Sequence, residues 1–200
     1  MYLLSALSLT VALISSTFVA AAPNLEHRAV CGNITNAYNL RRMYSDTVKD
    51  HIYTISVFEE GGYLFAPQGY VAQTLNAALL FRFATDASSL VPLYHLYQSA
   101  TQTNLYTSSA SLRQTLLTVA QPPYTDATFP GSVGSIAIEA YVYPDGSCPG
   151  TVPLLWASNS LITDNYYTID TAEYNSFVAN GYTPMDPVGW VYPVPPDQEI

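Results

Sequence analysis

The chain has 200 residues and a formal net charge of −9, and only 10% of its residues are charged. An acidic surface repels phosphate backbones and anionic lipids, which argues against nucleic-acid and membrane-surface partners. Few charges combined with 17 tyrosines are typical of a rigid β-rich extracellular domain, and they exclude a disordered tail.

Residues 1–22 have the layout of a secretory signal peptide. An apolar run over 3–14 is followed by small side chains at 19–22, and the run is too short to span a bilayer well. A signal anchor is the alternative. A second cut after Arg28 would remove a short propeptide. We therefore expect a secreted, extracellular protein whose residues 29–193 form one domain, with a flexible tail at 194–200.

The two cysteines, Cys31 and Cys148, predict one disulfide in an oxidising compartment. Such a bridge closes a long loop, which stabilises the fold by about 4–5 kcal/mol in the chain-entropy model. Free thiols or an intermolecular bridge are the alternatives. Asn33 begins the sequon Asn-Ile-Thr and is the expected glycosylation site.

The chain contains three copies of a Tyr-Thr repeat. The copies are 40–44 (LRRMY) with 50–54 (DHIYT), 93–97 (LYHLY) with 103–107 (TNLYT), and 154–158 (LLWAS) with 164–168 (DNYYT). In each, the opening Leu and the Tyr of the Tyr-Thr pair are thirteen positions apart. A further Tyr follows each pair (Tyr70, Tyr124, Tyr182), and each copy closes on an aromatic segment (81–83, 141–144, 190–193). The repeats therefore cover about 38–86, 91–144 and 152–193.

The first two copies differ in the element that follows the Tyr-Thr pair. In the first, Gly61, Gly62 and Pro67 disfavour a helix after Ser56. In the second, Ser109 can cap a helix over 110–120, which two prolines end. A Gly- and Ser-containing loop is then inserted at 129–135.

The third copy has the clearest local pattern. Strands are expected over 152–157 and 165–169, and Asp170 can cap a helix over 172–179. Gly181 provides a left-handed stop for that helix, and a strand over 188–192 ends the copy.

Three hairpin-like copies cannot each bury an apolar face alone, but they can share one core around a common axis. We therefore predict a mainly β, pseudo-threefold, β-trefoil-like domain of three repeats, each with a short helix. An irregular threefold α+β assembly without a trefoil barrel is the alternative.

Several of these segments resemble a secreted triple-repeat family of unknown function. They are 91–97 (VPLYHLY), 164–168 (DNYYT), 172–174 (AEY), 180–182 (NGY) and 189–193 (GWVYP), and the resemblance covers about 38–193. The family consensus runs approximately PLYRLYNPxTGDHFYT, AEYDN, GY and EGxAGYVY. Such domains occur as secreted fungal proteins and as modules of bacterial cell-wall hydrolases, which implies surface glycan attachment. The consensus Arg and His survive only as Arg42 and His51.

Catalytic patterns are poorly represented. Residues 131–135 (GSVGS) lack the order of a nucleophile elbow, and His51 and His95 have no metal-ligand spacing. We expect no cofactor and no metal. A glycoside hydrolase needs two carboxylates across a cleft. The available carboxylates are Glu59, Glu60, Glu139 and Asp164, for which surface or turn roles suffice.

Sugar binding requires only an aromatic face beside a polar side chain. Each copy supplies such a pair on one strand face: His51 with Tyr53, Asn104 with Tyr106, and Asn165 with Tyr167. The favoured alternative is structural, with these tyrosines in the core and their hydroxyls satisfying buried backbone groups.

The leading hypothesis is a non-catalytic binding module for extracellular or cell-wall carbohydrate. The second is a secreted effector or inhibitor that binds a protein through loops at 129–135 and 61–68. A glycoside hydrolase-like enzyme is the third. Function should depend on what differs between the copies, above all His51 against Asn104 and Asn165.

Overall fold

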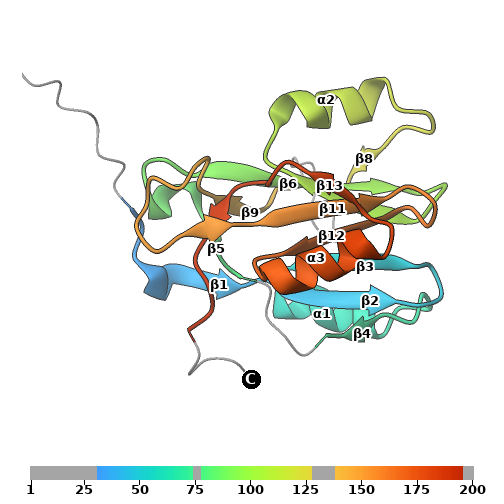
Figure 1. Cartoon of the computed structure of the whole chain (residues 1–200), viewed down its shortest axis with the longest axis horizontal. Coiled ribbons are helices and arrows are strands. Elements are labelled where there is room, and N and C mark those ends of the chain that lie inside the picture. Colours follow the sequence, from blue (N-terminus) through green and yellow to red (C-terminus); the bar gives the residue numbers. More distant parts are fainter. Residues whose placement is uncertain (1–30, 74–77, 128–137, 196–200) are drawn as a thin grey trace, which may run out of the picture.

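The computed structural model describes residues 31–73, 78–127 and 138–195 (Figure 1). The predicted signal peptide, the propeptide and the insertion at 129–135 lie outside these residues, as does most of the predicted tail. Among the described helices, none is both long and apolar enough to cross a membrane.

Three units share one order of elements: strand, strand, helix, strand. Unit one contains β2 (Arg41–Ser45), β3 (Asp50–Thr54), α1 (Val57–Leu64) and β4 (Val71–Ala72). Unit two contains β6 (Val91–Gln98), β7 (Thr103–Thr107), α2 (Ala110–Thr118) and β8 (Thr125–Asp126). Unit three contains β11 (Leu155–Asn159), β12 (Asp164–Thr168), α3 (Thr171–Ala179) and β13 (Thr183–Met185). In each unit the first strand pairs antiparallel with the other two. The prediction of a mainly β fold with short helices is confirmed.

The remaining elements join the ends of the units. They are η1 (Ile34–Asn36), β1 (Ala37–Asn39), β5 (Leu79–Phe81), η2 (Ala84–Asp86), β9 (Ile138–Val142), β10 (Val152–Pro153) and β14 (Trp190–Val191). Strand β5 pairs with β1 and β9, and β10 pairs with β14. The closing aromatic segments of the three repeats meet here, because the rings of Phe81, Tyr143 and Tyr192 contact one another edge to face at 5.8–6.2 Å.

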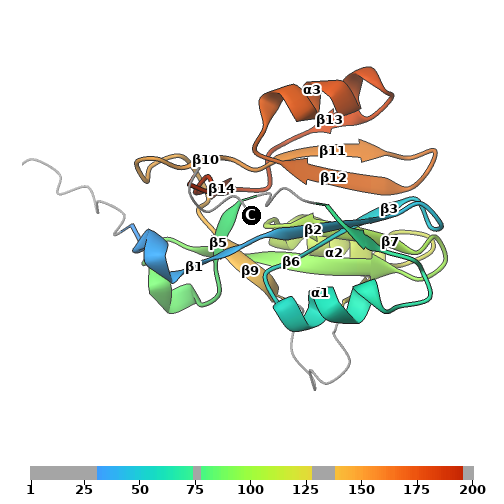
Figure 2. The same ribbon diagram turned by 90° about the horizontal axis from the view of Figure 1, so that it is seen from below.

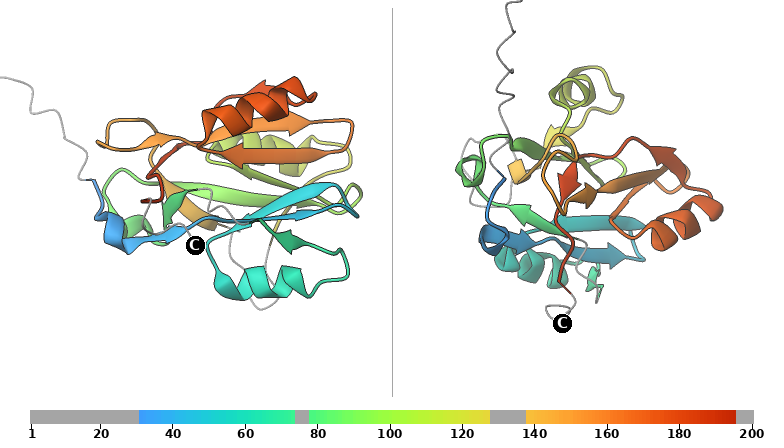
Figure 3. Two further views of the ribbon diagram at one scale, coloured as in Figure 1. Left: turned by 60° about the horizontal axis from the view of Figure 1, so that its bottom comes forward. Right: turned by 60° about the vertical axis from the view of Figure 1, so that its left-hand side comes forward.

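Each of the three helices begins at a side-chain cap. The helices lie on the outside of the molecule, away from the second strands of the units, β3, β7 and β12, which we call the inner strands (Figure 3). Ser109 accepts the N–H of Leu112, and Asp170 accepts the N–H groups of the residues two and three positions on. Helix α3 ends where Gly181 adopts a φ of +95°, as the sequence predicts. Helix α2 ends at Thr118, two residues earlier than predicted.

The prediction that glycines prevent a helix after Ser56 is wrong. Ser56 caps α1 by accepting the N–H of Glu59, and the helix runs through both glycines. Each glycine costs about 1 kcal/mol in a helix interior. Tertiary contacts compensate, since Tyr63 packs edge to face on Tyr70 with their rings 5.7 Å apart. The segment 61–68 is therefore mostly helix end and turn, and not an extended binding loop.

The inner strands β3, β7 and β12 contact one another although they belong to three different sheets (Figure 2). The fourth residue of each strand is a tyrosine, and Tyr53, Tyr106 and Tyr167 are each 1% exposed. The Tyr106 hydroxyl accepts the N–H of Tyr53 and donates to its carbonyl, at 2.9 and 2.7 Å. The Tyr167 hydroxyl does the same to Tyr106 at 2.9 Å, and the N–H of Tyr167 donates to the Tyr53 hydroxyl at 2.8 Å. These contacts close a ring that joins the three inner strands.

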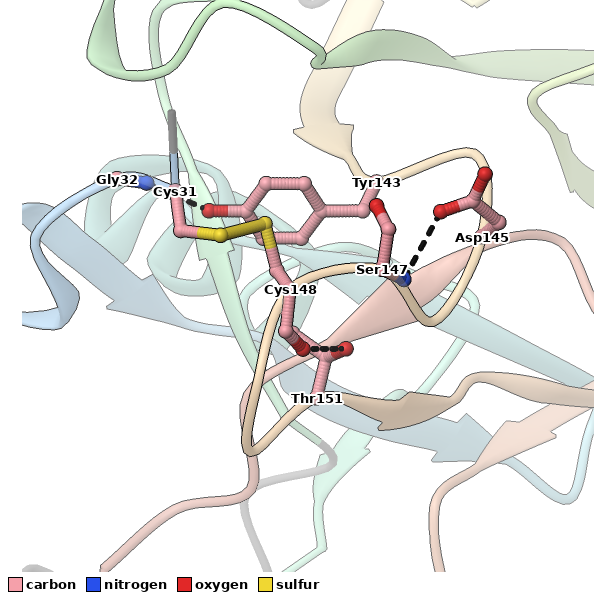
Figure 4. Close-up of a disulfide and its surroundings, with 7 residues drawn as sticks. All are labelled: Cys31, Gly32, Tyr143, Asp145, Ser147, Cys148 and Thr151. Carbon is pink, nitrogen blue, oxygen red and sulfur yellow. Dashed lines mark hydrogen bonds between the residues drawn. A yellow bond between two sulfur atoms is a disulfide. The ribbon is translucent and has the colours of Figure 1, made fainter. Parts of the chain in front are cut away.

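The predicted disulfide between Cys31 and Cys148 is confirmed, with the two Cα atoms 5.6 Å apart (Figure 4). Next to it, the N–H of Gly32 donates to the Tyr143 hydroxyl at 2.8 Å. The bridge ties the start of the domain to the linker between units two and three. Asn33 is exposed and accepts the N–H of Thr35 at 3.1 Å; its glycosylation stays a prediction.

Replacing Tyr106 by Phe should lower the free energy of unfolding by about 1–3 kcal/mol, because it leaves a buried N–H and carbonyl of Tyr53 without their partner while the ring is kept. Tyr167→Phe should cost a similar amount. Urea denaturation measures both. Tyr38→Phe is the control: Tyr38 is 42% exposed, and its change should stay within about 0.5 kcal/mol. Equal stabilities of all three variants would contradict the proposed role of the hydroxyl ring.

The hairpin turns of the three units supply a second stability prediction. Lys49, Gln102 and Thr163 occupy the same turn position with φ of 55–58°. A β-branched residue is strained there, whereas Asn tolerates this region. Thr163→Asn should therefore raise the free energy of unfolding by about 1 kcal/mol. Thr47→Asn, a turn position without positive φ, should change it by less than about 0.5 kcal/mol. A Thr163→Asn protein that melts below the parent would refute the prediction.

Candidate functional site

All six residues proposed for ligand binding lie in the interior. The three tyrosines form the hydroxyl ring, so the structural alternative considered for them describes what their hydroxyls do. Their polar neighbours His51, Asn104 and Asn165 are each 3% exposed. None of the six is a surface platform for a sugar.

The polar neighbours also link the units, but Asp50 and Asp164 each bond the unit on the side opposite to the one that the tyrosine hydroxyl of their own unit bonds. Asp164 accepts from the backbone N–H of His51 at 2.8 Å and lies 2.7 Å from its Nδ1. Asp50 accepts from the backbone N–H and the Nδ2 of Asn104, at 3.0 and 2.6 Å. Unit two has Thr103 where the other units have Asp, and there Asn165 donates to the Asn104 carbonyl at 2.9 Å.

Asn104 is the member of this set that borders a cavity. A pocket of about 350 Å³ opens at the junction of units one and two. We call it the junction pocket. Its lining residues are Tyr63, Gln68 and Tyr70 from unit one, and Tyr97, Gln102, Asn104, Thr125, Asp126 and Ala127 from unit two. The pocket therefore combines three phenol rings with three carboxamides, a hydroxyl and a carboxylate.

Strand register explains how unit two supplies one wall of the junction pocket. Tyr97 is directly opposite Asn104 on β7 and opposite Thr125 on β8. Directly opposed residues project from the same face of a sheet, so the three side chains form one surface. Tyr63 and Tyr70 form the facing wall, and the Tyr70 hydroxyl donates to Asp50 at 2.8 Å.

The corresponding junction between units three and one is filled by an aromatic side chain. His51 stands where unit two has Asn104, and its ring lies 4.5 Å from that of Tyr44 and 5.9 Å from that of Phe177. An imidazole is larger than a carboxamide. The smaller Asn104 therefore leaves space beside Tyr97, the counterpart of Tyr44.

The polar groups of the junction pocket are not all satisfied within the protein. Asp126 is paired with Arg113, whose Nε lies 2.8 Å from Oδ1. The Oε1 atom of Gln68 is buried and has no hydrogen-bond partner among the described residues. Below the pocket, burial raises the pKa of Asp50 to about 7, against the hydrogen bonds from Asn104 and Tyr70. The pocket thus presents an open acceptor, and the carboxyl of Asp50 below it is about half protonated at pH 7.

The four carboxylates considered for hydrolysis do not line the junction pocket. Glu60 pairs with Arg41 at 2.9 Å, and Asp164 is hydrogen-bonded to His51. Glu59 accepts from the Thr54 hydroxyl at 2.6 Å, and Glu139 accepts from the Ile55 N–H at 2.8 Å. These contacts are structural, and the one made by Glu139 holds unit one against β9.

Glu139 and His95 form a buried polar contact beside the tyrosine ring. Burial raises the pKa of Glu139 to about 7 and lowers that of His95 to about 4. The His95 Nε2 lies 2.8 Å from the Asn104 Oδ1, an acceptor, so Nε2 carries the proton. Nδ1, 3.8 Å from Glu139, is then an acceptor that suits a protonated carboxyl. Both groups are therefore uncharged between about pH 4 and 7.

Sequence reasoning missed most of the junction pocket. Tyr70 and Tyr97 belong to the repeat pattern, but nothing in it separates them from core tyrosines. Tyr63 and Gln68 carry no repeated signal. Only the difference between His51 and Asn104 marked the place in advance.

Stability should fall as the pH rises from about 4.5 to 7. The raised pKa values of Asp50 and Glu139 mean that the folded chain holds two protons that the unfolded chain releases near the ordinary pKa values of 3.8 and 4.5. His95 acts oppositely, since its pKa is lowered from 6.5. Over this range the folded chain therefore binds about one proton more than the unfolded chain. The free energy of unfolding should fall by at most about 1.4 kcal/mol per pH unit. Urea unfolding at several pH values measures it.

Glu139→Gln tests the assignment. It removes one carboxyl, so the contributions of Asp50 and His95 should cancel and stability should become nearly independent of pH over this range. Glu60→Gln, which alters a partly exposed ion pair, should keep the parental slope. A parent protein that gains stability between pH 5 and 7 would show that these pKa directions are wrong.

Comparison with known proteins gives a family but no function. A family model described as "Domain of unknown function (DUF5648)" matches residues 24–130 and 135–192. No curated protein and no solved structure matches the chain.

Proposed function

Since the chain belongs to the DUF5648 family, a domain family of unknown function, we propose its function from the junction pocket: a secreted, non-catalytic module that binds carbohydrate of an extracellular or cell-wall polymer. The observation that carries this proposal is the combination of Tyr63, Tyr70 and Tyr97 with uncharged hydrogen-bonding side chains in one cavity.

The chemistry of the junction pocket suits a sugar ring. A pyranose has apolar C–H faces that pack on aromatic rings and hydroxyls that need donors and acceptors. A cavity of about 350 Å³ lies in the size range of small-molecule sites. Gln102 and Thr125 offer amide and hydroxyl groups at its wall.

The unpartnered Oε1 of Gln68 strengthens the argument. A buried acceptor without a hydrogen bond costs about 1–3 kcal/mol, and a sugar hydroxyl in the pocket would supply the missing donor. An apolar ligand would leave the cost in place. The pocket therefore favours a ligand rich in hydroxyl groups.

The trefoil-like arrangement of the three units is part of the proposal. It is supported by the cyclic order of the tyrosine contacts, in which each unit bonds the next. In this arrangement the three junctions are equivalent by symmetry, and they differ only through their side chains.

The second candidate is a secreted effector or inhibitor that binds a protein. It is supported by two exposed phenylalanines on and beside α1, Phe58 at 83% and Phe65 at 92% exposure, because exposed aromatic side chains mark protein contacts. Phe58→Ser with Phe65→Ser would remove such a contact and leave the junction pocket unchanged.

Tyr97→Ala should weaken carbohydrate binding at least about tenfold, since a stacked ring contributes about 1.4 kcal/mol or more. Binding is first located on a glycan array and by polysaccharide pull-down, and is then measured by calorimetry. Tyr44→Ala is the matched control, because Tyr44 occupies the same strand position in unit one and should leave the affinity unchanged.

A second variant fills the junction pocket and keeps a bond to Asp50. Asn104→His introduces the residue that unit one uses, and the imidazole can bond Asp50 as His51 bonds Asp164. It should abolish binding in a protein that still unfolds cooperatively. The proposed function is rejected if the folded parent binds no glycan. Capture of a protein that depends on Phe58 and Phe65 would favour the second candidate.

A further inference from the structure

The junction pocket does not end at its own rim. A second, shallower depression of about 400 Å³ lies between the hairpin turns of units one and two. It is lined by Thr47, Val48, Ala100, Thr101 and Gln102. Gln102 also lines the junction pocket, so the two hollows meet at one side chain.

Gln102 is held in a defined position at this boundary. Its backbone has a φ of 55°, which a non-glycine residue adopts only where the surrounding turn requires it. The neighbouring Thr101 hydroxyl donates to the Gln98 Oε1 at 2.5 Å and lies 2.8 Å from the Thr103 hydroxyl. The floor of the depression next to Gln102 is therefore fixed before any ligand arrives.

The two hollows differ in chemistry. Among the described residues, the junction pocket is lined by three aromatic rings, whereas the turn depression is lined by small and polar side chains. Of these lining residues none is Lys or Arg, and the one carboxylate, Asp126, is paired with Arg113. One ring of an uncharged ligand can therefore stack in the pocket, while a continuation of the ligand lies on the turns and bonds through hydroxyls.

We infer that the ligand is an uncharged linear glycan, with one sugar in the junction pocket and the next crossing Gln102 onto the depression between the two hairpin turns. The inference deepens the proposed function and rests on it. A single sugar would fill only the pocket. A chain would gain contacts on the turns until it passes beyond them, so affinity should rise with length and then level off.

The test is a series of β-1,4-linked glucose and N-acetylglucosamine oligomers of one to six units, titrated by NMR or calorimetry. For the series that binds, we expect about a tenfold gain in affinity, or about 1.4 kcal/mol, from one to three units and little beyond. Ala100→Lys places a long side chain over the depression. It should remove the gain with length and leave the affinity for one unit unchanged.

The matched control is Leu161→Lys, which makes the same change at the corresponding exposed turn of unit three. It should keep the full gain with length. Affinity that is independent of length but lost in Tyr97→Ala would overturn this inference and leave the proposed function standing. A gain with length that survives in Ala100→Lys would overturn it as well. If no oligomer or arrayed glycan binds the folded parent, the proposed function itself fails.

Discussion

The fold depends on hydrogen bonds that tyrosine hydroxyls make to the backbone of a neighbouring unit. Strands β3, β7 and β12 meet at the centre but belong to different sheets, so their inward-facing N–H and carbonyl groups cannot be satisfied by one another as in a ladder. Buried backbone groups must find a partner. Tyr53, Tyr106 and Tyr167 supply it from the adjacent unit. Each hydroxyl therefore bonds the backbone of another unit's inner strand. No unit can satisfy the backbone hydrogen bonds of its own inner strand alone.

Around this ring the three junctions differ in the side chains that occupy one equivalent pair of positions. Glu173 of unit three binds Arg42 of unit one with two hydrogen bonds. At the next junction, the corresponding Glu59 helps to raise the pKa of the buried Glu139, which lies 3.8 Å from His95. At the third, Leu112 packs against the core that contains Trp156. An ion pair, a polar cluster with a buried carboxyl and an apolar contact thus occupy equivalent places, because the tyrosine ring fixes the geometry and leaves the side-chain chemistry free.

The sequence predicts what the symmetry determines and misses what breaks it. The repeated Tyr-Thr pairs, the caps at Ser109 and Asp170 and the Cys31–Cys148 bridge follow from spacing and residue type. The helix over two glycines does not, since its stability comes from Tyr63 packing on a side chain of the same unit's last strand region. The junction pocket does not follow either. It needs two tyrosines from one repeat and an asparagine from the next, and no local sequence pattern predicts that these residues lie close together in space.

The asymmetry is where function can reside. At one junction His51 fills the space between units and contacts Tyr44 and Phe177. At the next, Asn104 makes the equivalent hydrogen bond to an aspartate, but its side chain is smaller and does not fill the space. The smaller side chain costs little, because the hydrogen bond that links the units is preserved. A cavity lined by tyrosines is the result. A repeat protein whose core is held by symmetric hydrogen bonds can open one junction in this way without weakening the other two.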